Sequence, residues 1–430
     1  MIYNINMIDN LLFLFKTLFI LSFESINYLY HKTYFKFIKN VSIKLANENL
    51  FYVKILQGIS AHNNLLDKDT SDFLLEYTDN VFFNKDQIDY GFYNSINDVN
   101  KIYPELEIDK NTFNVLNSGL ISVVFKGKMN NKDIIIKVIK KDIKSKMKRS
   151  IKQIDFLINI LKYFPFVKYL NIHDIFHENK QIMEEQLNFI SEVKNIKEFR
   201  ERFKNIDNII IPKVYEEFTN YDNNIIVMEY IKGRRINQIN LHEKDEYCLQ
   251  LVKFILKSLL YDGIYHSDLH PGNIIFVNDN DDNLKLGIID FGIVGRLTKE
   301  EQNIFYLFFL NLLSDRFKDA SEIILNLLSE KPDQLMISNI GDREKLINNI
   351  EKVCRNSVIT KRNFEPSDIY EIDKLLYQYN MKLSRFFCKL QITLAIADSL
   401  IQRLSNNKTY IDNIRIAFEL LCPGAIFDCE

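Results

Sequence analysis

The segments "GIYHSDLHPGNIIF" (residues 263–276) and "LGIIDFG" (residues 286–292) decide how this chain of 430 residues folds. In the first segment, Asp268 and Asn273 are separated by four residues, with apolar residues on both sides. In the second, Asp290 follows an apolar run and lies seventeen residues after Asn273. This order predicts a loop that carries Asp268 and Asn273, and a buried strand that ends at Asp290.

Carboxylate and amide side chains in this order are typical of a phosphoryl-transfer site. Such a site needs metal ions to neutralise phosphate charge and a carboxylate beside the attacking oxygen. We therefore expect Asp268 to be the catalytic residue and Asn273 and Asp290 to bind Mg²⁺, with ATP or ADP as the nucleotide. The alternative is that Asn273 and Asp290 are ordinary turn residues and His266 a buried histidine bonded to backbone. His270 fits a structural role as well as a functional one.

A second pattern, upstream, predicts a β-hairpin. The β-branched runs "LISVVF" (residues 120–125) and "DIIIKVI" (residues 133–139) are joined by the turn-rich "KGKMNNK" (residues 126–132). Alternating β-branched runs around a turn of this composition are a strand signal. The chain therefore contains a small sheet before its catalytic loop.

Lys137 lies inside the second of these runs, where an unpaired ammonium group is costly. We expect the ATP phosphates and the carboxylate of Glu192 to compensate its charge, with Glu184 and Glu185 as the next candidates. The alternative is that the strand lies at the edge of the sheet and Lys137 reaches water. Downstream, "VMEYIKG" (residues 227–233) resembles a strand and hinge that contact adenine. There Met228 would line the pocket, and the backbone would bond the base around Glu229 and Tyr230.

The remaining patterns predict helices. Leu187, Ile190 and Val193 fall on one face of a predicted helix, and a later amphipathic helix ends at Gly263, a suitable C-cap. From Thr298 onward the chain reads as helical to its end. Together these elements predict an α+β, protein-kinase-like fold with two lobes. Its expected parts are a helical N-terminal extension, a small lobe and a large helical lobe, over residues 1–110, 111–232 and 233–430.

Composition excludes some partners and compartments. The 55 Lys and Arg residues nearly balance the 57 Asp and Glu residues, so no global basic field predicts nucleic acid as a partner. The five cysteines are scattered without a CxxC pair, which favours a reducing, intracellular compartment. Nothing in the composition indicates an oligomeric state.

The N-terminus contains an apolar run, Leu11–Phe23, that polar residues interrupt at Lys16, Thr17 and Ser22. It is shorter than the about 20 residues of a spanning helix, and it lacks the features of a secretory signal. We therefore expect neither a transmembrane helix nor a signal peptide. The lysines that follow predict an amphipathic helix that lies on the core of the protein or, alternatively, on a membrane.

These residues resemble the UbiB family, the aarF-domain-containing (ADCK) atypical kinase-like proteins. "HSDLHPGN" (residues 266–273) matches the "HADLHPGN" of that family, and "IDFGIVGRL" (residues 289–297) is similarly close. "VKILQGISAHNNLLDKD" (residues 53–69) resembles the family's KxGQ segment, and "TDNVF" (residues 78–82) resembles the segment after it. The resemblance implies a kinase-like fold and ATP hydrolysis in support of ubiquinone or other lipid metabolism. It also implies a lipid or quinone precursor and a membrane surface as partners.

Three departures from the family pattern bear on the site. By resemblance, Lys54 and Gln57 would reach toward the nucleotide, but Leu56 replaces the KxGQ glycine. The alanine-rich nucleotide loop of the family is replaced by a loop with three expected nucleotide contacts, Ser118, Gly119 and Leu120. The acidic ExD motif aligns with Gln186, Leu187 and Asn188. Losing both acids would weaken metal binding or change its use; the alternative is sequence drift.

Four function hypotheses follow from these patterns. An active ATP-dependent phosphotransferase or ATPase is favoured by the intact Lys137, Asp268, Asn273 and Asp290. A catalytically weak nucleotide-binding pseudokinase scaffold would explain the altered ExD and KxGQ motifs. A small-molecule kinase has no use for the KxGQ-like segment, and a conventional protein kinase would carry an APE motif and a full Gly-rich loop.

Overall fold

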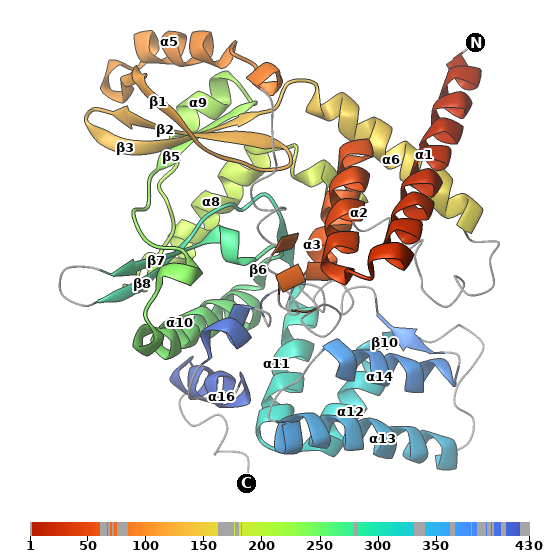
Figure 1. Ribbon diagram of the computed structural model, residues 1–430. Helices are drawn as coiled ribbons and strands as arrows, with labels where there is room; N and C mark the ends of the chain where they lie inside the picture. Colours follow the sequence, from red (N-terminus) through yellow and green to blue (C-terminus); the bar gives the residue numbers. More distant parts are fainter. Residues whose placement is uncertain are drawn as a thin grey trace. The chain divides into compact units, whose positions relative to one another are not determined.

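The computed structural model describes residues 2–60, 67, 69–70, 73–74, 85–161, 176, 180–181, 183–278, 283–330, 340–361, 366–379, 381–384, 393, 397, 400–405 and 410–421. The chain divides into two compact units (Figure 1). Unit 1 comprises residues 1–197 and 212–230, and unit 2 comprises residues 198–211 and 231–430. Both units mix helices with strands, as the α+β prediction requires. The expected domain boundaries after residues 110 and 232 stay a prediction.

Unit 1 contains one antiparallel sheet in the order β1-β2-β3-β5. Its strands are β1 (Ile108–Ser118), β2 (Ser122–Met129), β3 (Lys132–Ile139) and β5 (Ile225–Glu229). The predicted hairpin is confirmed as β2 and β3, and Asn130 and Asn131 turn the chain with φ of 48° and 64°. Asparagine adopts this left-handed conformation more readily than most residues, which suits a two-residue hairpin turn.

The faces of β3 alternate between two environments. Ile134, Ile136 and Val138 belong to an apolar core with Phe92 and Phe218 of the neighbouring helices. Because successive strand residues point to opposite faces, Lys137 lies on the other face. The helices of unit 1 are α1 (Ile2–His31), α2 (Tyr34–Glu48), α3 (Leu50–Ser60), α5 (Phe92–Ile102), α6 (Ile143–Leu161) and α9 (Glu216–Tyr221), with short turns at η1 (Lys85–Gln87) and η2 (Pro104–Leu106).

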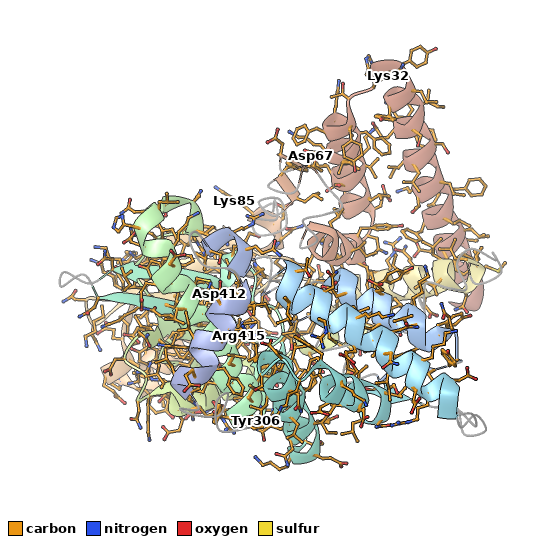
Figure 2. The ribbon with its side chains drawn as sticks, turned by 90° about the horizontal axis from the view of Figure 1, so that it is seen from below. Lys32, Asp67, Lys85, Tyr306, Asp412 and Arg415 are labelled. Atoms are coloured by element: carbon orange, nitrogen blue, oxygen red, sulfur yellow. The ribbon has the colours of Figure 1, made fainter. Side chains whose placement is uncertain are left out.

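The N-terminal helices form a hairpin whose turn lies at Lys32, between α1 and α2 (Figure 2). The expectation that α1 packs on the protein core is wrong for most of its length. Of its described side chains, Phe13, Thr17 and Glu24 are buried, whereas Phe15 is 72% exposed and Phe19 is 68% exposed. No described helix combines the length and the apolarity that crossing a membrane requires.

Helix α8 (Phe189–Phe203) begins later than the apolar spacing predicts. Asn188 Oδ1 accepts a hydrogen bond from the backbone N–H of Ser191 at 3.1 Å, so Asn188 caps the helix. Leu187 therefore lies in the preceding turn, and Ile190 is 41% exposed. The face predicted from Leu187, Ile190 and Val193 is wrong because a local cap determines where the helix starts.

Unit 2 is mostly helical, with short strand pairs between the helices. Its helices are α10 (Lys244–Leu256), α11 (Lys299–Leu313), α12 (Phe317–Asn326), α13 (Ile340–Arg355), α14 (Pro366–Tyr377) and α16 (Tyr410–Leu421), with π-helical turns η6 (Lys257–Asp262) and η8 (Asn356–Lys361) and 3-10 turns η4 (Ile236–Gln238), η5 (Leu241–Glu243) and η7 (Pro271–Asn273). Its strands are β4 (Ile209–Ile210), β6 (Ile264–His266), β7 (Ile274–Asn278), β8 (Leu284–Ile288), β9 (Val294–Arg296), β10 (Ser329–Glu330) and β11 (Lys382–Leu383).

Two predicted helix ends of unit 2 are confirmed. Gly263 ends the helical run with φ of 65°, a conformation that glycine adopts without strain. Thr298 caps α11, because its hydroxyl oxygen accepts a hydrogen bond from the Glu301 N–H. The Glu301 carboxylate in turn accepts a hydrogen bond from the Thr298 N–H. The prediction that the chain is helical from Thr298 to its end is wrong at residues 329–330 and 382–383, where β10 and β11 pair.

Glu243, at the end of η5 just before α10, anchors three segments of unit 2. It is 3% exposed and accepts hydrogen bonds from Arg234 at 2.6 Å, the Asn240 N–H at 2.7 Å and Asn278 at 3.1 Å. The Arg234 guanidinium is the main cause that lowers the pKa of Glu243 to about 2. The carboxylate form is therefore bound more strongly in the folded state than in the unfolded state.

We expect Glu243→Gln to lower the free energy of unfolding at neutral pH by about 1–3 kcal/mol, because Arg234 loses a charged partner in a buried site. The stabilisation is fully present above the ordinary carboxyl pKa of 4.5 and is lost as the pH falls toward 2. Urea unfolding of parent and variant at several pH values should therefore show a difference that shrinks on acidification. A difference that does not depend on pH would contradict this account.

Candidate functional site

A buried ion pair joins β3 to α8 within unit 1. Lys137 Nζ lies 2.8 Å from Glu192 Oε1 and 3.0 Å from Oε2, with side-chain exposures of 10% and 1%. The Phe189 ring lies 5.4 Å from the same ammonium group. Strand β3 pairs with both β2 and β5, so the alternative of an edge strand is wrong. Glu184 and Glu185 are exposed, and the carboxylate that pairs with Lys137 is Glu192.

The loop between β1 and β2 contains the three expected nucleotide contacts. Gly119 N–H donates to Ser122 O at 3.0 Å, which closes the loop as a tight turn, and Ser118 and Leu120 are buried. Lys140 Nζ donates to Gly119 O at 2.6 Å. Sequence reasoning missed this support for the loop. The signal available was the Lys-Lys pair that directly follows the apolar strand.

The expected adenine hinge is positioned by β5. Met228 is buried and pairs with Ile135 of β3. The N–H of Glu229 donates to Lys213 O at 2.8 Å, and the N–H of Tyr230 donates to Asp133 O at 3.3 Å. Both donors are therefore used inside unit 1. A base at this hinge would have to be recognised through other backbone groups.

In unit 2, two strand pairs bring the catalytic-loop residues together. Strands β7 and β8 are antiparallel with Ile274 opposite Ile288, so the residues before β7 and after β8 share one end of the ladder. Asn273 and Asp290 occupy those positions, and the Ile289 N–H donates to Asn273 O at 2.9 Å. Strands β6 and β9 are also antiparallel and lead into the loop that carries Asp268.

His266 links this loop to the segment of Asp290. Its Nδ1 accepts from the Asp268 N–H at 3.2 Å, so Nε2 carries the proton and donates to Asp290 O at 2.5 Å. Burial lowers the pKa of His266, although Asp268 and Asp290 oppose that shift. The Phe291 ring lies 5.1 Å from the imidazole and 4.8 Å from Phe199 of α8. His266 is thus a buried histidine bonded to backbone, as the alternative interpretation of this loop proposed.

The two expected metal ligands are held in defined conformations. Asn273 donates from Nδ2 to Asp268 O at 2.8 Å. Its Oδ1 atom takes no part in this hydrogen bond and can serve as a metal ligand. Asp290 has φ of 66°, and its Oδ1 accepts from the Gly292 N–H at 3.1 Å. Within the described ranges, no three or more His, Cys, Asp or Glu residues gather as a metal site. Magnesium needs few protein ligands when phosphates supply the others, so an Asp and an Asn suit it.

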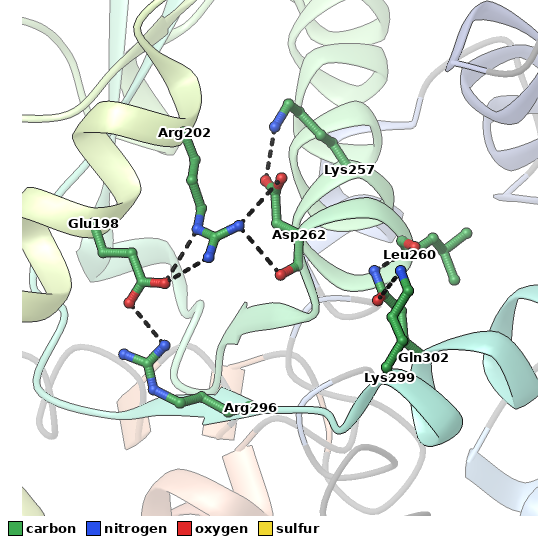
Figure 3. Close-up of polar contacts among 8 residues, drawn as sticks. All are labelled: Glu198, Arg202, Lys257, Leu260, Asp262, Arg296, Lys299 and Gln302. Atoms are coloured by element: carbon green, nitrogen blue, oxygen red, sulfur yellow. Dashed lines mark hydrogen bonds and ion pairs between the residues drawn. The ribbon is translucent and has the colours of Figure 1, made fainter.

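A surface network holds the C-terminal half of α8 to the β6–β9 pair (Figure 3). Glu198 pairs with Arg202 at 2.8 Å and with Arg296 of β9 at 2.7 Å. Arg202 also donates to Asp262 O at 3.3 Å, and Lys257 pairs with the Asp262 carboxylate at 2.7 Å. Within unit 2, the last turns of α8 are thus anchored beside the strands that lead to Asp268 and follow Asp290.

The KxGQ-like segment is described only in part. Lys54 is partly buried in α3, and Leu56, in place of the family glycine, is 9% exposed in the same helix. The side chain of Gln57 and the "TDNVF" stretch lie outside the described residues, and their roles stay predictions. Cys248 and Cys354 are buried free thiols, and the other three cysteines lie outside the described residues.

A strand lysine paired with a helix carboxylate, followed by an Asp, Asn and Asp set at strand ends, defines a kinase-like protein. The ABC1 atypical kinase-like domain model matches residues 77–324, more than half of the chain. The chain therefore belongs to this atypical kinase family, which includes the UbiB and ADCK proteins, and the predicted kinase-like fold is confirmed.

Similar proteins include a UbiB protein and two solved structures. "Probable protein kinase UbiB" of Blochmanniella pennsylvanica is 26% identical over 286 residues, which cover 65% of this chain and 51% of that protein. The chain thus spans about half the length of this relative. The Mycobacterium tuberculosis Rv3197–erythromycin structure has 15% identity, a TM-score of 0.47, and coverage of 86% and 91% of the two chains. The Chaetomium thermophilum Rio2 kinase complex with ADP/Mg²⁺ and phosphoaspartate has 12% identity and a TM-score of 0.32. The match covers 81% of this chain and 94% of that chain.

We expect Glu192→Gln to lower the free energy of unfolding by about 3–5 kcal/mol, because it removes the bidentate carboxylate from the buried Lys137 ammonium group. The double variant Lys137→Met/Glu192→Leu should lose much less, since no buried charge remains. Chemical unfolding of the single and double variants measures this difference. The exposed pair of Lys197 and Glu216 is the control, and its removal should cost under about 1 kcal/mol. If the losses in free energy of unfolding from single substitutions at Lys137 and Glu192 added up in the double variant, this account of the pair would be contradicted.

Proposed function

We propose that this chain is an atypical kinase-type ATPase or phosphotransferase that acts in ubiquinone or other lipid metabolism. The observation that carries the proposal is the buried Lys137–Glu192 pair, in a chain that belongs to the ABC1 atypical kinase family. Burying a cation and a carboxylate away from water has a large desolvation cost that hydrophobic residues would avoid. A nucleotide phosphate that uses the lysine is a reason to retain the pair.

Each site residue has a role in this proposal. Lys137 would bind the nucleotide phosphates, with Glu192 fixing its ammonium group. Asn273 Oδ1 and the Asp290 carboxylate would hold Mg²⁺, which neutralises phosphate charge when bound. Asp268 would orient or deprotonate the acceptor hydroxyl. His266 is a positioning residue, since its ring bonds the backbone of both aspartates.

A second candidate function is a nucleotide-binding pseudokinase scaffold with weak or no turnover. The observation that favours it is Asn188, which stands where the family carries an acid and whose side chain caps α8. Aspartate and asparagine cap helices about equally well, so the cap does not require the lost charge. The cap is thus kept without the acid, but a chain that lacks this negative charge would bind metal more weakly.

We expect ATP and ADP to raise the unfolding temperature of the parent only when Mg²⁺ is present. Asp290→Asn should remove the metal-dependent part of the shift, and Lys137→Met should weaken binding about tenfold or more, because a charge-assisted contact to phosphate is lost. The control is Asp207→Asn, an exposed aspartate of unit 2. Thermal shift measures binding, and a phosphate-release assay with lipid vesicles measures turnover.

The outcomes separate the two candidates. The enzyme is supported if the parent releases phosphate and Asp268→Asn abolishes this release while nucleotide binding stays intact. A magnesium-dependent shift without release supports the pseudokinase. No shift with either nucleotide would overturn both proposals.

We also propose that α1 lies on a membrane surface. Its exposed apolar residues follow the spacing of one helix face, at Ile8, Leu12, Phe15, Phe19, Ile26 and Leu29. Lys32 and Lys36 adjoin the end of this face, where they would meet anionic headgroups. A UbiB relative and the family's expected lipid role support this proposal.

We expect Phe15→Ser/Phe19→Ser to reduce binding to vesicles of phosphatidylcholine and phosphatidylglycerol by about tenfold or more, because two large apolar side chains no longer leave water. Co-sedimentation of the chain with the vesicles measures this. The matched control is Tyr370→Ser/Tyr377→Ser, which removes two aromatic side chains that are 71% and 61% exposed in unit 2. Equal loss in both variants, or no binding by the parent, would overturn the proposal.

A further inference from the structure

A cavity of about 550 Å³ lies in unit 1, where β3 leaves the sheet and α6 begins. Its wall comes from four segments: the start of α5, the end of β3, the first turn of α6 and the turn between α9 and β5. None of the residues that line it belongs to the predicted nucleotide or metal site. Its size is in the range of small-molecule sites in proteins.

The cavity opens beside a strongly cationic segment. Residues 140–148 contain five lysines and one acidic residue, and Lys140, Lys141 and Lys144 line the cavity. Among the described residues, no carboxylate lies within ion-pair distance of Lys141, Lys144 or Lys146, and Lys144 Nζ donates to the neutral Asn224 Oδ1 at 3.1 Å. The first turn of α6 contains no acidic residue, although cations are unfavourable at that end of a helix.

The pKa of Lys140 reflects both its burial and the positive charge of a neighbouring lysine. Burial is the main cause that lowers the pKa of Lys140 to about 8, and the nearby charge of Lys146 contributes to this shift. A positive field that the chain itself leaves uncompensated attracts an anion.

Three carboxylates line the cavity, and two of them, Asp222 and Asp89, are already used by the chain. Asp222 accepts from the Ser95 hydroxyl at 2.7 Å and from the Asn224 N–H at 3.0 Å. Asp89 accepts from the Gly91 N–H at 3.0 Å. The ammonium groups of Lys141 and Lys144 and the exposed Asp142 carboxylate therefore remain as the charged groups offered to a ligand, and their net charge is positive.

Part of the wall is apolar. Phe92, Val138 and Ile143 line the cavity beside the lysines. A bare inorganic ion would leave this surface in water, whereas an organic anion would cover it. The combination of two exposed lysines and an apolar wall suits a ligand with an anionic head and a carbon chain.

We propose that this cavity is a binding site for an organic phosphate monoester, with Lys141 and Lys144 on the phosphate and Phe92 and Ile143 against the carbon chain. A soluble metabolite or the headgroup of an anionic phospholipid can supply this chemistry. The site is separate from the nucleotide site and does not depend on catalysis.

The position of Lys140 connects this cavity to the nucleotide loop. Its backbone N–H donates to Ile121 O at 2.9 Å and its ammonium donates to Gly119 O at 2.6 Å. Both ends of the residue thus hold the loop between β1 and β2. A ligand bound beside Lys140 would alter the loop, and this coupling rests on the proposed function.

The test is calorimetric titration of the full chain with n-hexyl phosphate, without nucleotide or Mg²⁺. The matched variants are Lys141→Ala/Lys144→Ala, which changes the cavity, and Lys146→Ala/Lys148→Ala, which removes the same charge from the same helix outside it. We expect the first pair to weaken binding about tenfold or more and the second less than about threefold, since exposed charges act weakly at a distance. Circular dichroism checks that both variants remain folded.

Controls with other probes define the chemistry and its source. Hexanol and inorganic phosphate should each bind at least about tenfold more weakly than hexyl phosphate, because each lacks one of the two contacts. Binding to phosphatidic acid vesicles that depends on Lys141 and Lys144, without binding of hexyl phosphate, would assign the site to a lipid headgroup. Equal loss in both lysine pairs, or no binding of any phosphate probe, would overturn the site.

The coupling to the nucleotide loop is measured separately. If ADP binds the parent, its affinity with saturating hexyl phosphate should change about threefold or more, and Lys140→Met should remove the change. An unchanged ADP affinity would overturn the coupling, and the absence of any ADP binding would overturn the proposed function instead. The titration without nucleotide is unaffected by either result.

Discussion

The buried pair of Lys137 and Glu192 is the interaction on which the rest of unit 1 depends. A charged lysine in an interior strand is tolerated only if a carboxylate meets it, and that carboxylate must come from an element packed on the same face of the sheet. Helix α8 satisfies this need, and Asn188 determines its first turn. The position of Glu192 therefore follows from a helix cap as much as from the pair itself.

In unit 2, backbone hydrogen bonds between strands position the residues of the candidate site. Antiparallel pairing places the residue before β7 and the residues after β8 at one end of the ladder, so Asn273 and Asp290 need no long connection to approach each other. The neutral His266 ring then joins the backbone of Asp268 to that of Asp290. The polar side chains that would meet metal and phosphate are thus presented by backbone geometry that does not depend on a ligand.

Charge and apolar surface are distributed unevenly around this framework. One face of α1 exposes large apolar side chains. The start of α6 contains Lys144 and Lys146, and among the described residues no carboxylate lies within ion-pair distance of either. Neither feature helps unit 1 to fold, since exposed apolar area and like charges both reduce stability. Both are therefore proposed as surfaces for partners, a membrane at α1 and an organic phosphate at the cavity beside α6.

The sequence alone was sufficient for the β2–β3 hairpin, the end of the helical run at Gly263, the start of a helix at Thr298 and the choice of Glu192 as partner of Lys137. These depend on local turn chemistry, helix caps and the cost of an unpaired buried charge, all of which are legible in a short stretch of residues. The family followed from motifs in order, and the family model agrees. The roles of Ser118, Gly119, Leu120, Met228 and the other site residues remain predictions.

Only the tertiary structure showed where the spacing of apolar residues predicts a buried helix face incorrectly. Leu187, Ile190 and Val193 have helical spacing, but the side chain of Asn188 starts the helix after Leu187. The apolar residues of α1 have the composition of a core helix, yet most of them face outward, because whether an apolar face is covered depends on which segments fold against it. The bond from Lys140 to Gly119 joins positions that are apart in sequence. Such contacts are set by the path of the chain in space, which no local pattern contains.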